Sequence, residues 1–187
     1  MWNRFRIHGM KTRAAVATAA HKPLQIVEID VASPQEGEVL VRMAATGVCH
    51  TDVNALDGND RVLRFPVVLG HEGAGIVEEI GPGVESLEPG DHVITSCLPE
   101  CGSCDACTDG RTNVCEKFNI DQNTMLDGST RFSWDGRRVS HFMRNSTFAE
   151  YSVVPEISLA KISAEAKLET ACYIACGVAT GIGAVTH

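Results

Sequence analysis

The stretch PECGSCDACTDGRTNVC, residues 99–115, places four cysteines within a short segment: Cys101, Cys104, Cys107 and Cys115. Gaps of two residues let neighbouring thiolates turn inward onto one small ion, and four sulfurs complete a tetrahedron with no open position. The spacing therefore predicts a structural zinc site. Disulfides are the alternative, but they need an oxidising compartment and nothing in the sequence indicates secretion. A structural zinc loop of this kind belongs to a larger host domain.

The bulk composition is that of an ordinary globular protein. The chain has 187 residues, of which 44% are hydrophobic and 21% charged, and its net charge is −8. This acidic balance argues against nucleic acid or an anionic membrane surface as a partner. No run approaches the ~18 apolar residues of a membrane span. We expect a cytoplasmic protein with a disordered extension at residues 1–10.

Short strands dominate the expected secondary structure. Alternating or short apolar runs bounded by glycine and proline predict strands. They lie within residues 12–31 (two strands around a turn at 21–23), 38–43, 66–69, 75–81, 92–95 and 148–154. Thr46-Gly47 is expected to break the third strand. Residues 119–147 are expected to form a surface loop with a hairpin at Asp135-Gly136. Ser163 is expected to cap a helix that runs to about Ile174.

This pattern predicts a mainly β (α+β) domain built as an irregular barrel with few helices. A doubly wound nucleotide-binding domain would need regular βαβ alternation and a G-x-G-x-x-G motif behind a strand, and the chain shows neither. The glycine-rich segment Gly177–Gly183 has a different spacing and no strand before it.

A second set of possible metal ligands is spread along the chain. Cys49 and His71 each follow an expected strand, and Cys176 follows the expected late helix. Two cysteines and one histidine with an open fourth position form a recurring catalytic zinc set. Taken singly, each residue has a simpler interpretation, because a lone cysteine is usually a buried apolar residue and a lone histidine in a turn is usually solvated.

The motifs around these residues resemble those of zinc-dependent medium-chain alcohol dehydrogenases. The segments that carry the resemblance are Gly47-Val-Cys-His-Thr-Asp52, Gly70-His-Glu-Gly-Ala-Gly75, the four-cysteine stretch and Cys176-Gly-Val-Ala-Thr-Gly181. The likeness covers residues 11–187. Within the family, Cys-His-Thr-Asp and Asp127–Ser133 look most like the class III enzymes, the S-(hydroxymethyl)glutathione dehydrogenases.

The resemblance implies a fold and a domain organisation. Residues 11–187 would form a GroES-like zinc-binding catalytic domain with a structural zinc lobe at 97–116. The nucleotide-binding (Rossmann) domain of the family is expected after residue 187 and is missing from this chain. The full-length form would be a homo-oligomer.

The resemblance also implies roles for individual residues. Two zinc ions would bind per chain: a structural one in the lobe, and a catalytic one held by Cys49, His71 and Cys176, with Glu72 beside it as an exchanging ligand. Thr51 would begin the proton relay, although a threonine here also fits a helix N-cap. Asp52 would accept a hydrogen bond from the zinc-bound histidine, and His50 and Thr180 would contact NAD. For Asp52 and Glu72 the simpler interpretation is a surface charge.

Some positions depart from the family pattern. Asn54 stands where some members carry a relay histidine, and Asn119 stands where class III enzymes carry an arginine that holds glutathione. Asp57 or Asp60 would then supply polar contacts, unless each is only an exposed loop acid. Cys97 and Cys172 fit neither zinc set and are expected to be buried structural thiols.

The expected function is oxidation of a primary alcohol, S-(hydroxymethyl)glutathione being one candidate, with hydride transfer to NAD. The alternatives are a dehydrogenase of long-chain or aromatic alcohols, and a truncated zinc-binding module without turnover. A zinc-ribbon nucleic-acid binder is disfavoured by the acidic charge and the 5% aromatic content.

Overall fold

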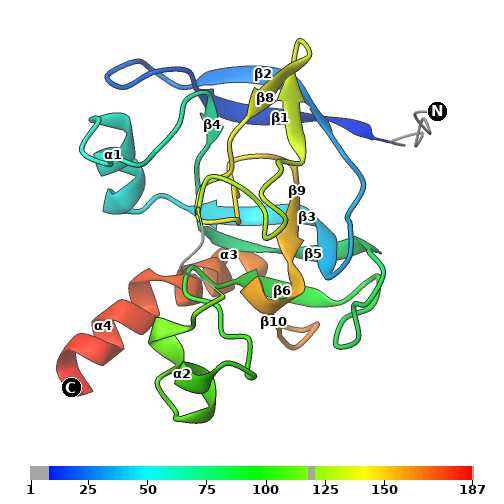
Figure 1. Cartoon of the computed structure of the whole chain (residues 1–187), viewed down its shortest axis with the longest axis vertical. Helices are drawn as coiled ribbons and strands as arrows, with labels where there is room; N and C mark the ends of the chain where they lie inside the picture. Colours follow the sequence, from blue (N-terminus) through cyan, green and yellow to red (C-terminus); the bar gives the residue numbers. More distant parts are fainter. Residues whose placement is uncertain (1–8, 118–120, 187) are drawn as a thin grey trace.

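Two antiparallel sheets form the body of the molecule (Figure 1). The computed structural model describes residues 9–117 and 121–186. Within these residues, one sheet has the strand order β4-β1-β2-β7-β8 and the other β10-β6-β5-β3-β9. An isolated bridge between Ala14 and Ala149 joins the first sheet to the segment before β9. The two sheets together make a nearly closed barrel.

The strands are short, as the frequent glycine and proline turns predict. Their bounds are β1 Met10–Ala17, β2 Gln25–Val31, β3 Glu38–Gly47, β4 Val67–Val68, β5 Glu72–Ile80, β6 His92–Thr95, β7 Phe132–Trp134, β8 Arg137–Val139, β9 Tyr151–Pro155 and β10 Leu159–Lys161.

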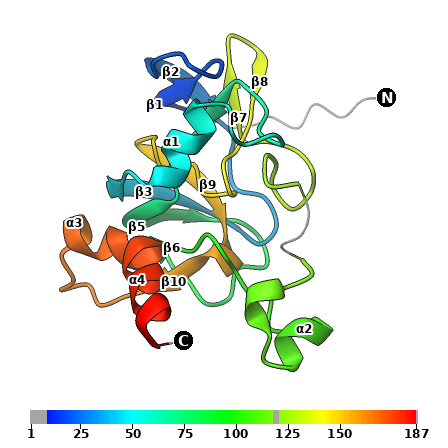
Figure 2. The same ribbon diagram turned by 90° about the vertical axis from the view of Figure 1, so that its left-hand side faces the viewer.

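Helices are few and lie at the periphery. They are α1 His50–Leu56, α2 Asp105–Thr108, α3 Leu168–Ala171 and α4 Gly177–Thr186, with 3-10 turns η1 Thr112–Val114, η2 Glu156–Ser158 and η3 Cys172–Ala175. The lobe that carries α2 projects away from the barrel (Figure 2).

The core follows from the two-residue period of the strands. Along β3, Leu40 packs with Phe132 and Val153 in the cluster between the sheets. Its neighbours Val39 and Val41 point to the opposite face, where they pack in a second cluster. Successive side chains of a strand alternate between faces, so β3 supplies both cores. The mainly β fold expected from the sequence is confirmed, including the hairpin at Asp135-Gly136, which joins β7 and β8.

The segment expected to be a surface loop is instead largely internal. Met125 and Phe132 belong to the central core, and several polar side chains of the segment are buried with hydrogen-bond partners. Arg131 donates two hydrogen bonds of 2.7 Å to the Glu38 carboxylate, and Asn123 accepts from the Arg64 N–H. Buried polar groups are tolerated when they are paired in this way. Composition alone therefore gave the wrong location for residues 121–147.

Three element boundaries also differ from expectation. Ser163 does not cap a helix, because its hydroxyl accepts from the Glu165 N–H in a local turn, and the helix begins at Leu168. Strand β3 runs through Thr46 and Gly47 rather than breaking there, and β5 begins at Glu72.

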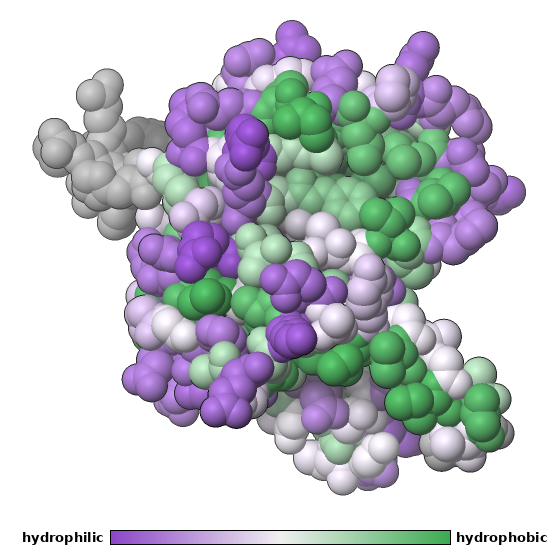
Figure 3. Space-filling view, turned by 180° about the vertical axis from the view of Figure 1, so that it is seen from behind, coloured by the Kyte–Doolittle hydropathy of each residue, from purple (hydrophilic) through white to green (hydrophobic). Residues whose placement is uncertain are grey.

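The ends of the chain were only partly anticipated. Met10, assigned to the extension, pairs with Val31 as the first residue of β1, and residues 1–8 lie outside the described part. Helix α4 occupies the glycine-rich segment, and Val178, Ile182 and Val185 on it are exposed. Figure 3 shows hydrophobic surface at the lower right, where α4 projects from the molecule. Within the described residues no single helix is long and apolar enough to cross a membrane; the bent pair Leu168–Ala175 and Gly177–Thr186 passes on length and composition alone.

His141 is a buried histidine that the barrel keeps neutral. Its Nε2 accepts the Arg131 N–H at 3.0 Å, and its ring stacks on Phe132 with centroids 4.6 Å apart. Burial, reinforced by the charges of Arg131 and Arg138, lowers the pKa of His141 to about 3. The histidine pKa is near 6.5 in the unfolded chain. Between about pH 3 and pH 6.5 the unfolded chain therefore binds a proton at His141 that the folded chain does not bind.

We therefore expect acid to destabilise the fold through His141. Below pH 6.5 its contribution to the free energy of unfolding should fall by up to about 1.4 kcal/mol per pH unit. Replacement by glutamine, which can still accept the Arg131 N–H, should remove this slope. Urea unfolding of wild type and His141→Gln at pH 7, 6 and 5 measures it, and an unchanged difference between the two proteins at all three pH values would contradict the prediction.

Candidate metal centres

Four side chains from three separate parts of the chain converge at one end of the barrel. Cys49 is the extended residue that precedes α1, His71 and Glu72 stand at the start of β5, and Cys176 lies between η3 and α4. One ligand atom from each of the four lies within 4.8 Å of all the others. The fold thus brings together the four residues that the sequence singled out for this site.

The spacing of the donor atoms fits a zinc ion. Cys49 Sγ and Cys176 Sγ are 4.0 Å apart, and both cysteines are free thiols. Zinc–sulfur bonds of ~2.3 Å in a tetrahedron place two sulfurs roughly 3.8 Å apart, whereas a disulfide would hold them at ~2.05 Å. Two sulfurs, an imidazole and a carboxylate are also the donor types that zinc accepts.

The Asp52 carboxylate ties two of the ligand segments together. It is 1% exposed; Oδ2 accepts the Cys49 N–H and Oδ1 accepts the Gly70 N–H, each at 3.0 Å. Oδ1 also lies 3.5 Å from Nδ1 of His71, but Nδ1 makes no hydrogen bond among the described residues, so the hydrogen bond expected between them is not formed here. Since Nδ1 is turned toward Asp52, Nε2 is left to face the thiols.

The Glu72 carboxylate makes the corresponding link to the third ligand segment. Glu72 is 4% exposed, and its Oε1 accepts the N–H of Gly177, the residue after Cys176, at 3.0 Å. The carboxylate also lies against Gly47, where a Cβ would collide with it. Position 47 therefore requires glycine, because any side chain there would collide with the Glu72 carboxylate.

The acid–base properties of the set reflect crowding and partial burial. Burial alone would raise the pKa of Cys49, but hydrogen bonds from Thr51 and the contact with His71 outweigh it and lower that pKa. Burial and the nearby thiols Cys97 and Cys49 raise the pKa of Cys176 to about 12. Burial would lower the pKa of His71, but Asp52 outweighs it and the pKa is raised. A divalent cation would favour both thiolates and the neutral imidazole.

The residues assigned to proton relay and cofactor contacts surround this set. The Thr51 hydroxyl lies 3.5 Å from Cys49 Sγ and is half-buried. His50 is the exposed first residue of α1. Thr180 is exposed in the first turn of α4, and its N–H donates to the Cys176 carbonyl at 2.8 Å. His50 and Thr180 are thus exposed, and Thr51 is partly accessible.

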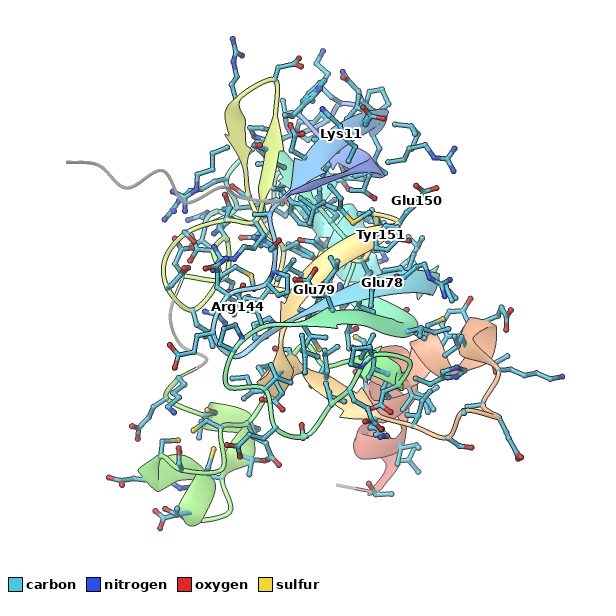
Figure 4. All side chains as sticks on the ribbon, turned by 90° about the vertical axis from the view of Figure 1, so that its right-hand side faces the viewer. Lys11, Glu78, Glu79, Arg144, Glu150 and Tyr151 are labelled. Carbon is cyan, nitrogen blue, oxygen red and sulfur yellow. The ribbon has the colours of Figure 1, made fainter. Side chains whose placement is uncertain are left out.

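The second cysteine set is a local structure. Cys101, Cys104, Cys107 and Cys115 also offer sulfurs within 4.8 Å of one another, with 4.0 Å between Cys104 and Cys115. Figure 4 shows sulfur atoms gathered in the lobe that carries α2. The lobe's apolar cluster consists of these four residues alone. An all-sulfur set of this spacing fits a closed zinc site.

The thiols of the lobe do not share a common pKa. A hydrogen bond from Ser103 lowers the pKa of Cys101 to about 6, whereas burial raises the pKa of Cys107 to about 11. Thiols this close repel one another when ionised, so a cation is needed to hold all of them as thiolates.

The remaining predicted positions lie in different surroundings. Cys172 is buried as expected, but Cys97 is half-buried and lies 3.8 Å from the Ala175 carbonyl, next to Cys176. Asn54 and Asp57 are exposed on or just after α1, Asp60 bonds the nearby Val62 N–H, and Asn119 lies outside the described residues. Sequence reasoning also missed Thr95, a buried residue whose hydroxyl contacts the backbone around Glu72, because it belongs to no ligand motif.

Comparisons with known proteins give the family. Residues 35–164 match the alcohol dehydrogenase GroES-like domain. Over 178 residues, 94% of the chain, the sequence is 57% identical to S-(hydroxymethyl)glutathione dehydrogenases from Escherichia coli O1:K1 and from Shigella sonnei. The chain spans about half the length of these relatives, 48% of each.

Solved structures agree with this assignment. An alcohol dehydrogenase zinc-binding domain protein from Burkholderia ambifaria superposes with a TM-score of 0.88 at 39% identity, covering 95% of this chain and 48% of that one. Benzyl alcohol dehydrogenase from Acinetobacter calcoaceticus gives 0.83 at 34% identity, covering 94% and 47%. Both the matched domain and these structures identify the barrel expected from the sequence, and the chain belongs to the GroES-like domain family of the alcohol dehydrogenases.

Proposed function

We propose that the chain is the zinc-binding catalytic half of a dehydrogenase that oxidises primary alcohols with NAD. The observation that carries this proposal is the convergence of Cys49, His71, Glu72 and Cys176 to within 4.8 Å. The 57% identity to S-(hydroxymethyl)glutathione dehydrogenases supports the reaction class. The cysteine lobe would hold a second, structural zinc ion through Cys101, Cys104, Cys107 and Cys115.

Cys49, His71 and Cys176 would hold the catalytic ion, with Glu72 able to exchange onto it. A zinc ion there supplies Lewis acidity that lowers the pKa of a bound alcohol. Thr51 would receive the alcohol proton, and the 3.5 Å between its hydroxyl and Cys49 Sγ supports this role. Asp52 orients His71, and the exposed side chains of His50 and Thr180 would contact the dinucleotide.

Two substrate classes have support. The relatives named S-(hydroxymethyl)glutathione dehydrogenase favour a glutathione adduct, and the likeness to benzyl alcohol dehydrogenase favours an aromatic alcohol. A zinc-binding module without turnover is the third candidate; the chain spans 48% of the length of these relatives.

Metal analysis tests the two sites separately. We expect two zinc ions per purified chain, one after Cys49→Ser, and one after Cys104→Ser, because each change removes a ligand from only one set. Elemental analysis of dialysed protein measures the count, with Asp109→Asn, an exposed change in the lobe, as the control. A Cys49→Ser protein that retains two ions would contradict the catalytic ligand set.

The lobe should melt more easily without its ion. We expect Cys104→Ser to lower the melting temperature by several degrees and to expose the lobe to protease, because the lobe has no other apolar core among its described residues. Differential scanning calorimetry and limited proteolysis measure this against Asp109→Asn. Equal melting of Cys104→Ser and wild type would count against a structural ion.

Turnover distinguishes the candidate functions. NADH formation from NAD and benzyl alcohol, or from formaldehyde with and without glutathione, identifies the substrate class. Any turnover should fall about 100-fold in Thr51→Val and recover in Thr51→Ser, which keeps the hydroxyl. A chain that binds two ions but forms no NADH with any substrate would be a zinc-binding module.

A further inference from the structure

The Thr95 hydroxyl occupies a particular place in the backbone of the ligand segment. Thr95 is the last residue of β6 and is 2% exposed. Its Oγ1 donates to the His71 carbonyl at 2.8 Å and accepts the Gly73 N–H at 2.9 Å. These two backbone groups flank Glu72, so one hydroxyl makes hydrogen bonds to the backbone on both sides of that residue.

The Thr95 hydroxyl is needed because the pairing between β5 and β6 ends just before Gly73. The β5–β6 pairing runs from Ile76–His92 to Ala74–Ile94 and stops before Gly73. On its other side Gly73 pairs with Thr46 of β3. Beyond Ala74 the Thr95 side chain therefore takes over the role that β6 backbone groups play earlier in the ladder.

Packing holds the hydroxyl in this position. A Cβ on Gly73 would meet the methyl groups of both Thr147 and Thr95, so the glycine lies between two threonines. Thr147 is itself fixed, because its hydroxyl lies 2.6 Å from that of Thr46 and its N–H donates to the Gly70 carbonyl at 3.0 Å. A β-branched residue has few rotamers, so the Thr95 hydroxyl is pre-oriented.

We propose that Thr95 is a positioning residue that fixes the directions of His71 and Glu72 for metal binding. This inference rests on the proposed function. Asp52 orients the His71 ring, and Thr95 fixes the backbone from which the imidazole and the Glu72 carboxylate leave. Loss of the hydroxyl leaves a buried carbonyl and a buried N–H without this partner, and the turn relaxes to find others. Mutation of a group that orients a metal ligand typically weakens metal affinity by about 10–100-fold.

Cobalt(II) titration of the whole chain tests the role. The all-sulfur lobe and the mixed set absorb differently, so each is followed in the same sample. For Thr95→Val, which keeps the shape and removes the hydroxyl, we expect about 10-fold or greater loss of affinity at the mixed set, a shifted cobalt absorption there, and unchanged binding in the lobe. Affinity within 3-fold of wild type with the same spectrum would overturn the proposal.

Two further variants test the same role without relying on Thr95→Val alone. Thr95→Ser and Thr95→Ala both lack the methyl group and differ only in the hydroxyl. Thr95→Ser should bind cobalt within a few-fold of wild type, and Thr95→Ala about 10-fold more weakly. Equal affinities in this pair would also overturn the proposal, even where Thr95→Val fails to fold. A wild-type mixed set that binds no cobalt would instead refute the proposed function.

Discussion

The buried carboxylate of Asp52 is the interaction on which the larger site depends. A carboxylate that is 1% exposed would be costly without partners, and here two backbone N–H groups and the edge of an imidazole supply them. Those partners come from the Cys49 segment and from the Gly70-His71 turn. Satisfying one buried charge therefore fixes the relative positions of two ligand segments that are distant in sequence.

The same logic extends to the third ligand segment. The buried Glu72 side chain lies beside two thiols, and it accepts a hydrogen bond from the Gly177 N–H, which fixes the residue next to Cys176. Burial and the neighbouring thiols raise the pKa of Cys176 to about 12, so without a cation its neutral thiol form is favoured. A divalent cation held by these donors would favour the thiolate forms of both cysteines.

The residues that converge at the larger site could be predicted from the sequence, and Asp52 was among them, whereas Thr95 and the buried ion pairs could not. Cys49, His71 and Cys176 stand in recognisable motifs next to glycines and strand ends, and these motifs indicate the residues that lie within 4.8 Å of one another in the fold. Thr95 carries no such signal, because its contacts depend on the point at which the pairing between β5 and β6 ends. Buried pairs such as Arg131 and Glu38 are also hidden in polar sequence, since composition does not reveal pairing.

The two cysteine sets differ in how their geometry is produced. Cys104 and Cys115 are 11 residues apart, and the short α2 and η1 turns are enough to bring their sulfurs to 4.0 Å. Cys49 and Cys176 reach the same separation across 127 residues, a long loop that only the folded barrel closes. An ion in the lobe would therefore organise its own surroundings, whereas an ion at the larger site would depend on Asp52, Glu72 and the sheet. This difference explains why the four-cysteine set of the lobe is encoded in one short stretch, whereas the set of Cys49, His71, Glu72 and Cys176 needs most of the chain.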